Sequence, residues 1–177
     1  MSDASILIVD DLPENLLALR AVIEPLGHRI VEANSGEEAL KRLLEEDFAV
    51  ALLDVQMPGL DGFETAEYIR RREHTQHLPI IFLTAIDKET HHVFRGYSVG
   101  AVDYIFKPFE PEILRSKVSV FVELHQTTGA LRDSEERFRT AFADAPIGIG
   151  LLSREGRFTQ VNRALCEIGR ASCRERV

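Results

Sequence analysis

Through its first 125 residues the chain alternates between short apolar runs and longer segments in which apolar residues recur at helical spacing. Continuously apolar runs indicate strands buried on both faces, which is typical of a parallel sheet covered by helices. Helical spacing is clear at Leu16, Leu19 and Ile23, and Pro25 and Gly27 end that segment. The expected strands occupy 5–9, 28–33, 49–53, 79–83 and 102–106, and the expected helices begin near 13, 35, 63, 87 and 111.

Five strand–helix units with short connections predict a doubly wound, flavodoxin-like α/β domain with a five-stranded parallel sheet. Four of the strands run into polar residues, which are Asp10 with Asp11, Asp54, Thr84 and Lys107. In such a sheet the carboxyl ends of the strands share one edge, where ligands bind. Three carboxylates, a hydroxyl and an ammonium group would converge there, and this set suits a divalent metal and a phosphoryl group.

Beyond residue 111 the helical pattern continues, and Leu124, Leu131 and Phe138 follow one another at seven-residue steps. This spacing is consistent with a paired-helix linker. Gly129 and the polar residues 126–128 weaken the pattern and favour a plain exposed connector instead. Both interpretations stay open at the level of sequence.

Composition and charge exclude several classes of function for this chain. Hydrophobic residues make up 45% and charged residues 28% of the 177 residues, as in ordinary globular proteins. A net charge of −8 and a pI near 5.3 argue against nonspecific nucleic-acid binding, which relies on basic patches. No apolar run approaches the ~20 residues of a membrane helix, the N-terminus lacks a signal-peptide pattern, and two cysteines cannot form a disulfide framework. We therefore expect a cytoplasmic protein that binds neither membranes nor nucleic acid.

Four motifs follow one another at the predicted strand ends, namely Val-Asp-Asp at 9–11, a segment at 53–62, Leu-Thr-Ala at 83–85 and Lys-Pro at 107–108. On these motifs, residues 1–125 resemble the receiver domain of bacterial two-component response regulators. The resemblance implies that a sensor histidine kinase or a histidine phosphotransfer protein donates a phosphoryl group to this domain.

Asp54 is the expected phospho-acceptor, because a carboxylate can take a phosphoryl group to give a labile acyl phosphate. Crowded carboxylates are unfavourable without a cation, and hard oxygen ligands favour Mg²⁺. We expect the metal to be held by Asp10, Asp11 and Asp54 and, by resemblance, by the backbone carbonyl of Gln56.

The phosphoryl group itself would be bound by Thr84, Ala85 and Lys107. Lys107 would neutralise its oxygens, Thr84 would donate a hydroxyl hydrogen, and the small Ala85, by resemblance, leaves access to the aspartate. Thr84 and Tyr104 form the switch that the resemblance implies, with the ring turning inward when the threonine moves. The face formed by the fourth helix, fifth strand and fifth helix would then change, and a homodimer could form through this face or through the linker.

Each of these residues has a purely structural alternative. Asp10 and Asp11 could cap the helix that follows, Thr84 could be an ordinary strand-end residue, and Lys107 could be a surface lysine. Tyr104 could be a half-buried strand residue without a switching role.

The same family pattern also bears on Asp61, His125, Gln56 and Ile86. Asp61 is expected to cap the next helix rather than to bind the metal, and His125 lacks the neighbours of a phospho-accepting histidine. In the family, side chains at the positions of Gln56 and Ile86 affect attack by water. Because Ile86 cannot orient a water molecule, we expect slow self-dephosphorylation.

The remaining chain is expected to hold a second, incomplete α+β domain. A strand–turn–strand pattern predicts a hairpin over 147–162, and residues 131–166 resemble the start of a PAS sensor domain. We expect a helical linker over 126–143 and a truncated PAS start over 144–166. Residues 167–177 back-translate to a common sequencing adapter and are expected to be read-through.

The sequence thus predicts a phosphorelay switch, the N-terminal fragment of a hybrid sensor histidine kinase, with a diguanylate cyclase or phosphodiesterase as the alternative output. A Mg²⁺-dependent phosphohydrolase with an Asp nucleophile is the alternative from another class. Such enzymes usually carry a second acid two residues after the nucleophile, whereas Val55 and Gln56 follow Asp54. A DNA-binding regulator is disfavoured, because the hairpin is not a basic helical domain.

Overall fold

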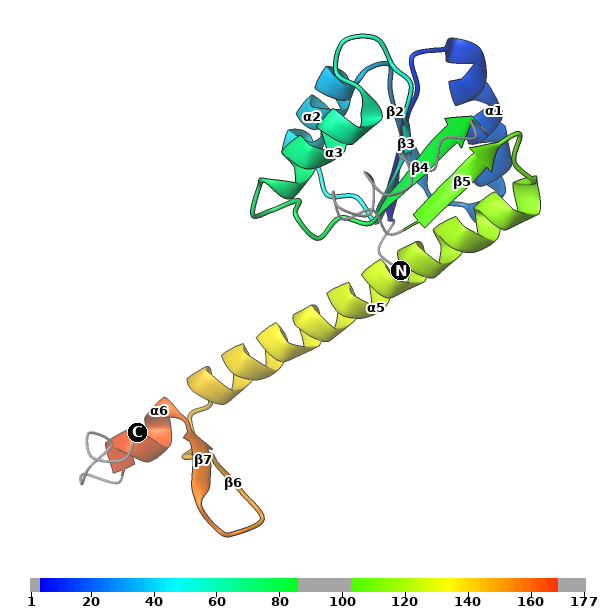
Figure 1. Cartoon of the computed structure of the whole chain (residues 1–177). Helices are drawn as coiled ribbons and strands as arrows, with labels where there is room; N and C mark the ends of the chain where they lie inside the picture. The colour runs from blue at the N-terminus through cyan, green and yellow to red at the C-terminus, as the bar shows by residue number, and fades with distance from the viewer. Residues whose placement is uncertain (1–3, 86–102, 169–177) are drawn as a thin grey trace. The chain divides into compact units, whose positions relative to one another are not determined.

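The computed structural model of the chain describes residues 4–85 and 103–168 (Figure 1). The expected helix beginning near residue 87 and the position of Ile86 lie outside the described residues. The chain divides into two compact units, Met1–Gln126 and Thr127–Val177.

The first unit is built on a five-stranded sheet in which all neighbouring strands are parallel. The strand order is β2-β1-β3-β4-β5, the order of flavodoxin-like doubly wound sheets, which confirms the predicted architecture. The strands are β1 (Ser5–Val9), β2 (Arg29–Ala33), β3 (Val50–Asp54), β4 (Ile80–Ala85) and β5 (Asp103–Lys107).

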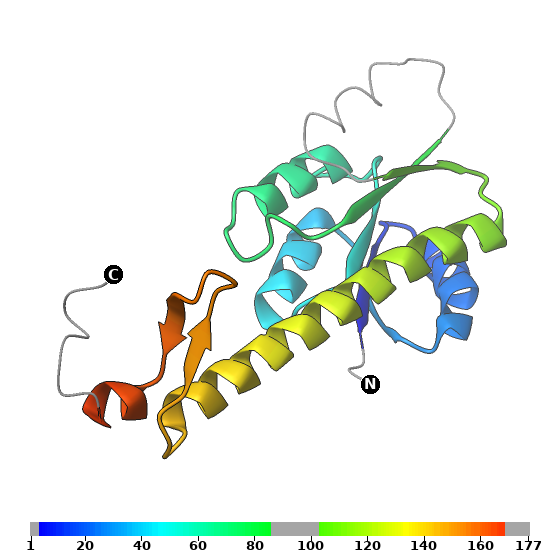
Figure 2. The ribbon, with the colours of Figure 1, turned by 90° about the horizontal axis from the view of Figure 1, so that it is seen from below.

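Helices cover both faces of this sheet, with α1 and α5 on one face and α2 and α3 on the other (Figures 1 and 2). Successive strand residues alternate between two cores, so that Ile6 belongs to the core under α1 and α5 and Leu7 to the core under α2 and α3. This two-sided burial explains why the strands are continuously apolar. The helices are α1 (Pro13–Ile23), followed by the 3-10 turn η1 (Glu24–Leu26), α2 (Gly36–Glu45), α3 (Gly62–Arg70) and α5 (Pro111–Asp144).

The loop after β3 is shaped by a glycine and a helix cap. The Gly62 N–H donates to the Val55 carbonyl at 3.1 Å, and a Cβ at residue 62 would lie 2.2 Å from the Asp54 carbonyl oxygen. Only glycine therefore permits this return of the chain beneath Asp54. Asp61 forms a capping box with Glu64, because its carboxylate accepts from the Glu64 N–H at 2.7 Å, which confirms its predicted role.

The first turns of α5 pack against the sheet. They bury Leu114, Val118 and Val122, which four-residue steps place on one helix face. Lys117 on the same stretch forms an ion pair with Asp103, the first residue of β5.

The helix then continues for 34 residues in all, through Gly129 and the polar residues 126–128. The sequence pattern is weak at this point because a glycine and polar residues lower helix propensity there. These residues do not end the helix.

The second unit contains a two-stranded antiparallel sheet, β6 (Gly150–Leu152) and β7 (Phe158–Val161), followed by α6 (Arg163–Ile168). Among the described residues of this unit, Asn162 is the buried polar one. Its Oδ1 accepts from the Ile149 and Leu165 N–H groups at 2.8 and 3.0 Å, and its Nδ2 donates to the Ile147 carbonyl at 2.8 Å. One side chain thus joins both arms of the predicted hairpin and caps α6. Among the described helices, none is both long enough and apolar enough to cross a bilayer.

Gly129→Ala is expected to stabilise α5. The position is exposed, and a Cβ there would meet no atom within 4 Å, so alanine adds helix propensity worth about 1 kcal/mol without a clash. Amide hydrogen exchange of the residues around 129 should slow. Gly62→Ala is the matched control and should destabilise the first unit; if Gly129→Ala leaves exchange unchanged or faster, the helix is not continuous in solution.

Candidate functional site

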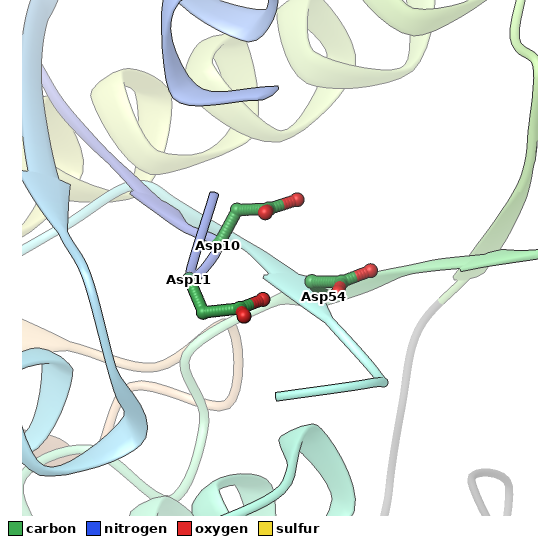
Figure 3. A group of neighbouring side chains, drawn as sticks. All are labelled: Asp10, Asp11 and Asp54. Atoms are coloured by element: carbon green, nitrogen blue, oxygen red, sulfur yellow. The ribbon is translucent and has the colours of Figure 1, made fainter. Parts of the chain in front are cut away.

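Three carboxylates meet at the carboxyl edge of the sheet, as the strand-end pattern predicts (Figure 3). Asp10 follows β1 and Asp54 ends β3, and period-2 alternation places both above the core covered by α1 and α5. Asp10 is fully buried and Asp54 is 6% exposed, whereas Asp11 is partly exposed. One oxygen from each residue lies within 4.8 Å of one oxygen from each of the others.

Lys107 reaches this cluster from the end of β5. Its Nζ donates to Asp10 Oδ2 at 2.9 Å and to Asp54 Oδ1 at 2.8 Å. A solvated surface lysine would not hold two buried carboxylates, so this alternative for Lys107 is wrong. The peptide bond from Lys107 to Pro108 is cis.

Asn15 belongs to the same cluster, although the sequence patterns do not single it out. Its Nδ2 donates to both oxygens of Asp10, at 2.9 and 3.0 Å. The Leu12 N–H also donates to Asp10 Oδ1, at 3.0 Å. Asp10 thus accepts hydrogen bonds from the entry to α1 as well as from Lys107, although among the described residues no side chain caps the first turn of that helix. The sequence signal that could have identified Asn15 is its polar side chain in the first turn of a helix that starts beside the strand ends.

The electrostatics of the cluster favour a bound cation. Burial raises the pKa of the Asp54 carboxyl group, Lys107 opposes that rise, and the charges of Asp10 and Asp11 add to it. Burial acts to lower the pKa of Lys107, but its bonds to Asp54 and Asp10 outweigh burial and leave the pKa raised. The lysine is therefore held in its charged form, while the aspartate carries an unfavourable charge.

Mg²⁺ is a fitting cation for these residues. It takes hard oxygen ligands, and one ammonium group cannot balance three carboxylates. Asp10, Asp11 and Asp54 would hold it. Gln56 is exposed on the loop two residues after Asp54, where its backbone carbonyl was expected to complete the set.

Thr84 and Ala85 lie at the end of β4 and differ in exposure and in the contacts that they make. Ala85 is exposed and pairs in register with Lys107. Thr84 leaves the strand from the same face as Phe82, above the core covered by α2 and α3, and its Oγ1 donates to the Ala85 carbonyl at 3.2 Å. Of the predicted residues, Asp10, Asp11, Asp54 and Lys107 are thus brought together, whereas the Thr84 hydroxyl is engaged by its own strand.

Tyr104 is half-buried on β5 and pairs in register with Phe82. The two ring centroids are 5.5 Å apart, and Phe82 in turn lies 4.8 Å from the ring of Phe63 in the first turn of α3. Three aromatic rings therefore connect the fifth strand with the helix that follows the Asp54 loop.

Comparison with known proteins places this site in a family. A family model described as the response regulator receiver domain matches residues 6–119. The chain belongs to this family. As a receiver domain it is part of a two-component phosphorelay system, in which receiver domains interact with histidine kinases or phosphotransfer proteins.

Relatives of the chain differ greatly in length. Protein PilH of Pseudomonas aeruginosa is 36% identical over 116 residues, which cover 66% of this chain and 95% of that protein. A probable cyclic di-GMP phosphodiesterase of Vibrio cholerae is 34% identical over 140 residues, 79% of this chain but only 31% of that protein. The receiver domain of a signal transduction histidine kinase from Syntrophus aciditrophicus has a TM-score of 0.63 and 28% identity, covering 68% of this chain and 90% of that one. The receiver is therefore matched nearly whole, whereas the phosphodiesterase continues far beyond what this chain matches.

Asp54→Asn is expected to raise the melting temperature of the metal-free protein near neutral pH. The raised pKa of Asp54 means that its charge costs the folded state free energy above that pKa and costs nothing below the ordinary value of 3.8. The gain should amount to a few degrees at neutral pH and disappear toward pH 4.

Mg²⁺ supplies the control for this measurement. It should raise the melting temperature of the wild-type protein, because it compensates the same charge, and should raise that of Asp54→Asn less. A variant that is no more stable than wild type at any pH would contradict the assigned electrostatics.

Proposed function

We propose that Asp54 is the phospho-acceptor of a Mg²⁺-dependent phosphorelay that switches the output of a larger protein. The observation that carries the proposal is the buried Asp54 carboxylate, bound by Lys107 at 2.8 Å beside two further carboxylates. A nucleophile, a cation and a ligand set for a metal are the parts that phosphoryl transfer requires.

In the proposed reaction the phosphoryl group passes from a histidine nitrogen of the partner to an oxygen of Asp54. The N–P bond breaks, with its electron pair left on nitrogen, and an O–P bond forms to Asp54. The histidine leaves as a neutral imidazole when its other ring nitrogen carries a proton. Lys107 binds Asp54 Oδ1, so it orients the carboxylate and presents Oδ2 for attack. Bound Mg²⁺ would supply positive charge for the phosphoryl oxygens, and Asp10, fixed by Asn15, would hold the metal in place.

Signal output is proposed to begin at Thr84. A phosphoryl group on Asp54 offers its hydroxyl a stronger, charge-assisted acceptor than the Ala85 carbonyl that it now uses. Movement of Thr84 toward the site would vacate space beside the half-buried Tyr104. The ring contact of Tyr104 with Phe82 would then change. Phosphorylation would thus shift the populations of two alternative packings of these rings.

The segments after the receiver are proposed as a helical linker over 126–143 and the start of a PAS domain over 144–166. The hairpin joined by Asn162 supports the second assignment. Residues 167–177 are proposed to be adapter read-through. The output is proposed to be a histidine kinase, with a phosphodiesterase or diguanylate cyclase as the alternative, and the site of action to be the cytoplasm.

A phosphohydrolase is the second candidate function, since an Asp nucleophile with Mg²⁺ also serves such enzymes. The residues after Asp54 do not support it. Val55 is buried, and Gln56 is an exposed amide where an acid would be needed for acid–base catalysis.

Incubation with acetyl phosphate and Mg²⁺ tests the assignment. Intact mass spectrometry should show a single phosphoryl adduct on the wild-type protein and none on Asp54→Ala. Asp61→Ala serves as the control, because this carboxylate caps α3 outside the cluster and the variant should still be modified. Continuous release of phosphate without an adduct would support the hydrolase instead.

Ile86→Glu is expected to shorten the life of phospho-Asp54. A carboxylate at this position could accept a hydrogen bond from the attacking water, which isoleucine cannot, and a several-fold faster loss of the adduct is expected. Ile86→Leu should decay at the wild-type rate. Decay that is unchanged or slower in Ile86→Glu would refute this account of the lifetime.

A further inference from the structure

Asn15, which is half-buried in the first turn of α1, contacts both oxygens of the buried Asp10. Its Nδ2 donates to them at 2.9 and 3.0 Å, whereas the Leu12 N–H donates to Oδ1 and Lys107 Nζ donates to Oδ2. Both acceptors belong to a carboxylate, so the nitrogen of the Asn15 amide and not its oxygen must face Asp10. A donor within reach of both oxygens holds the carboxylate at two points.

Lys107 is shared between two carboxylates that lie side by side, those of Asp10 and Asp54 (Figure 3). In the proposed function the phosphoryl oxygens on Asp54 become a third acceptor for its ammonium group. The phosphoryl group is attached to Asp54, so an ammonium group that turns toward it stays near Asp54 and gives up its bond to Asp10. Phosphoryl transfer therefore takes a charged partner away from Asp10.

The loss of this partner is tolerable only if Asp10 keeps other donors. Asp10 is fully buried, and a buried carboxylate without hydrogen bonds is strongly unfavourable. After Lys107 has turned away, Asn15 can still donate to both oxygens and the Leu12 N–H to Oδ1. The contacts from α1 thus compensate Asp10 for the bond that it loses.

An amide suits this position because it donates hydrogen bonds without carrying charge. A lysine or arginine in place of Asn15 would also hold Asp10, but it would cancel part of the negative charge that favours a divalent cation beside the three carboxylates. A leucine would leave the charge in place and donate nothing. Asparagine alone among these keeps Asp10 both fixed and negatively charged.

We propose that Asn15 is a positioning residue for phosphoryl transfer, which holds Asp10 while Lys107 passes from Asp10 to the phosphoryl group on Asp54. The role rests on the proposed function of Asp54. Asn15 would act through Asp10 and Lys107 and not on the reacting atoms themselves.

Asn15→Leu tests this role, because leucine has a similar size and no donor. The affinity of the protein for Mg²⁺ should fall about tenfold, as is typical when a hydrogen-bond partner of a metal ligand is removed. The chain has no tryptophan, so titration calorimetry measures this affinity. With Mg²⁺ at saturation, formation of the acetyl phosphate adduct should still be about tenfold slower, since Asp10 then retains Lys107.

Two further variants separate hydrogen bonding from charge. Asn15→Gln keeps the amide and should restore most of the Mg²⁺ affinity and of the rate. Asn15→Lys keeps a donor but adds a positive charge, so its Mg²⁺ affinity should stay below that of the wild type. A lysine variant that binds Mg²⁺ as tightly as the wild type would contradict the requirement for a neutral donor.

Ala18→Gly is the control for stability, because residue 18 is exposed on α1 and glycine weakens the helix without removing a bond to Asp10. It should lower the melting temperature and leave the Mg²⁺ affinity and the rate unchanged. Equal losses in Ala18→Gly, or a wild-type rate of Asn15→Leu at saturating Mg²⁺, would overturn the role of Asn15 alone. A wild-type protein that forms no adduct would overturn Asp54 as the acceptor and the role of Asn15 with it.

Discussion

The two charge-assisted hydrogen bonds that Lys107 donates, one to Asp10 and one to Asp54, are the interaction on which the first unit depends. It joins the ends of β5, β1 and β3, and β4 lies between β3 and β5 in the sheet. Without the ammonium group, two buried carboxylates would face each other beside a third, at a cost far larger than a surface charge incurs. The same arrangement leaves negative charge in excess, which favours a divalent cation beside the three carboxylates.

Sequence reasoning succeeded where the physical signal is periodic. Continuous apolar runs gave the buried strands, and the polar residues that follow them gave Asp10, Asp54 and Lys107, because a parallel sheet collects strand ends at one edge. Asp61 was placed correctly because a capping box is a local pattern of four residues, here from Asp61 to Glu64.

The same reasoning missed what depends on three-dimensional detail. Asn15 bonds to Asp10 across a turn whose path no periodicity encodes. The Thr84 hydroxyl is engaged with its neighbouring carbonyl, and strand alternation rather than residue type decides which face it leaves from. The helical course of 126–129 depends on the long helix around them, since propensity alone disfavours those residues.

The fifth strand is anchored by a lysine–aspartate pair at each end. At its carboxyl end Lys107 is bound to Asp10 and Asp54, and at its amino end Asp103 is bound to Lys117 of α5. The strand is only five residues long, and every residue of it pairs with β4, so one end cannot shift far without the other. A change in the hydrogen bonds of Lys107 would therefore act on β5, a strand of five residues. The other end of this strand is paired with α5 through Asp103 and Lys117. The ion pairs at the two ends of β5 thus link the carboxylate cluster to α5 by a route separate from the aromatic rings on the opposite face.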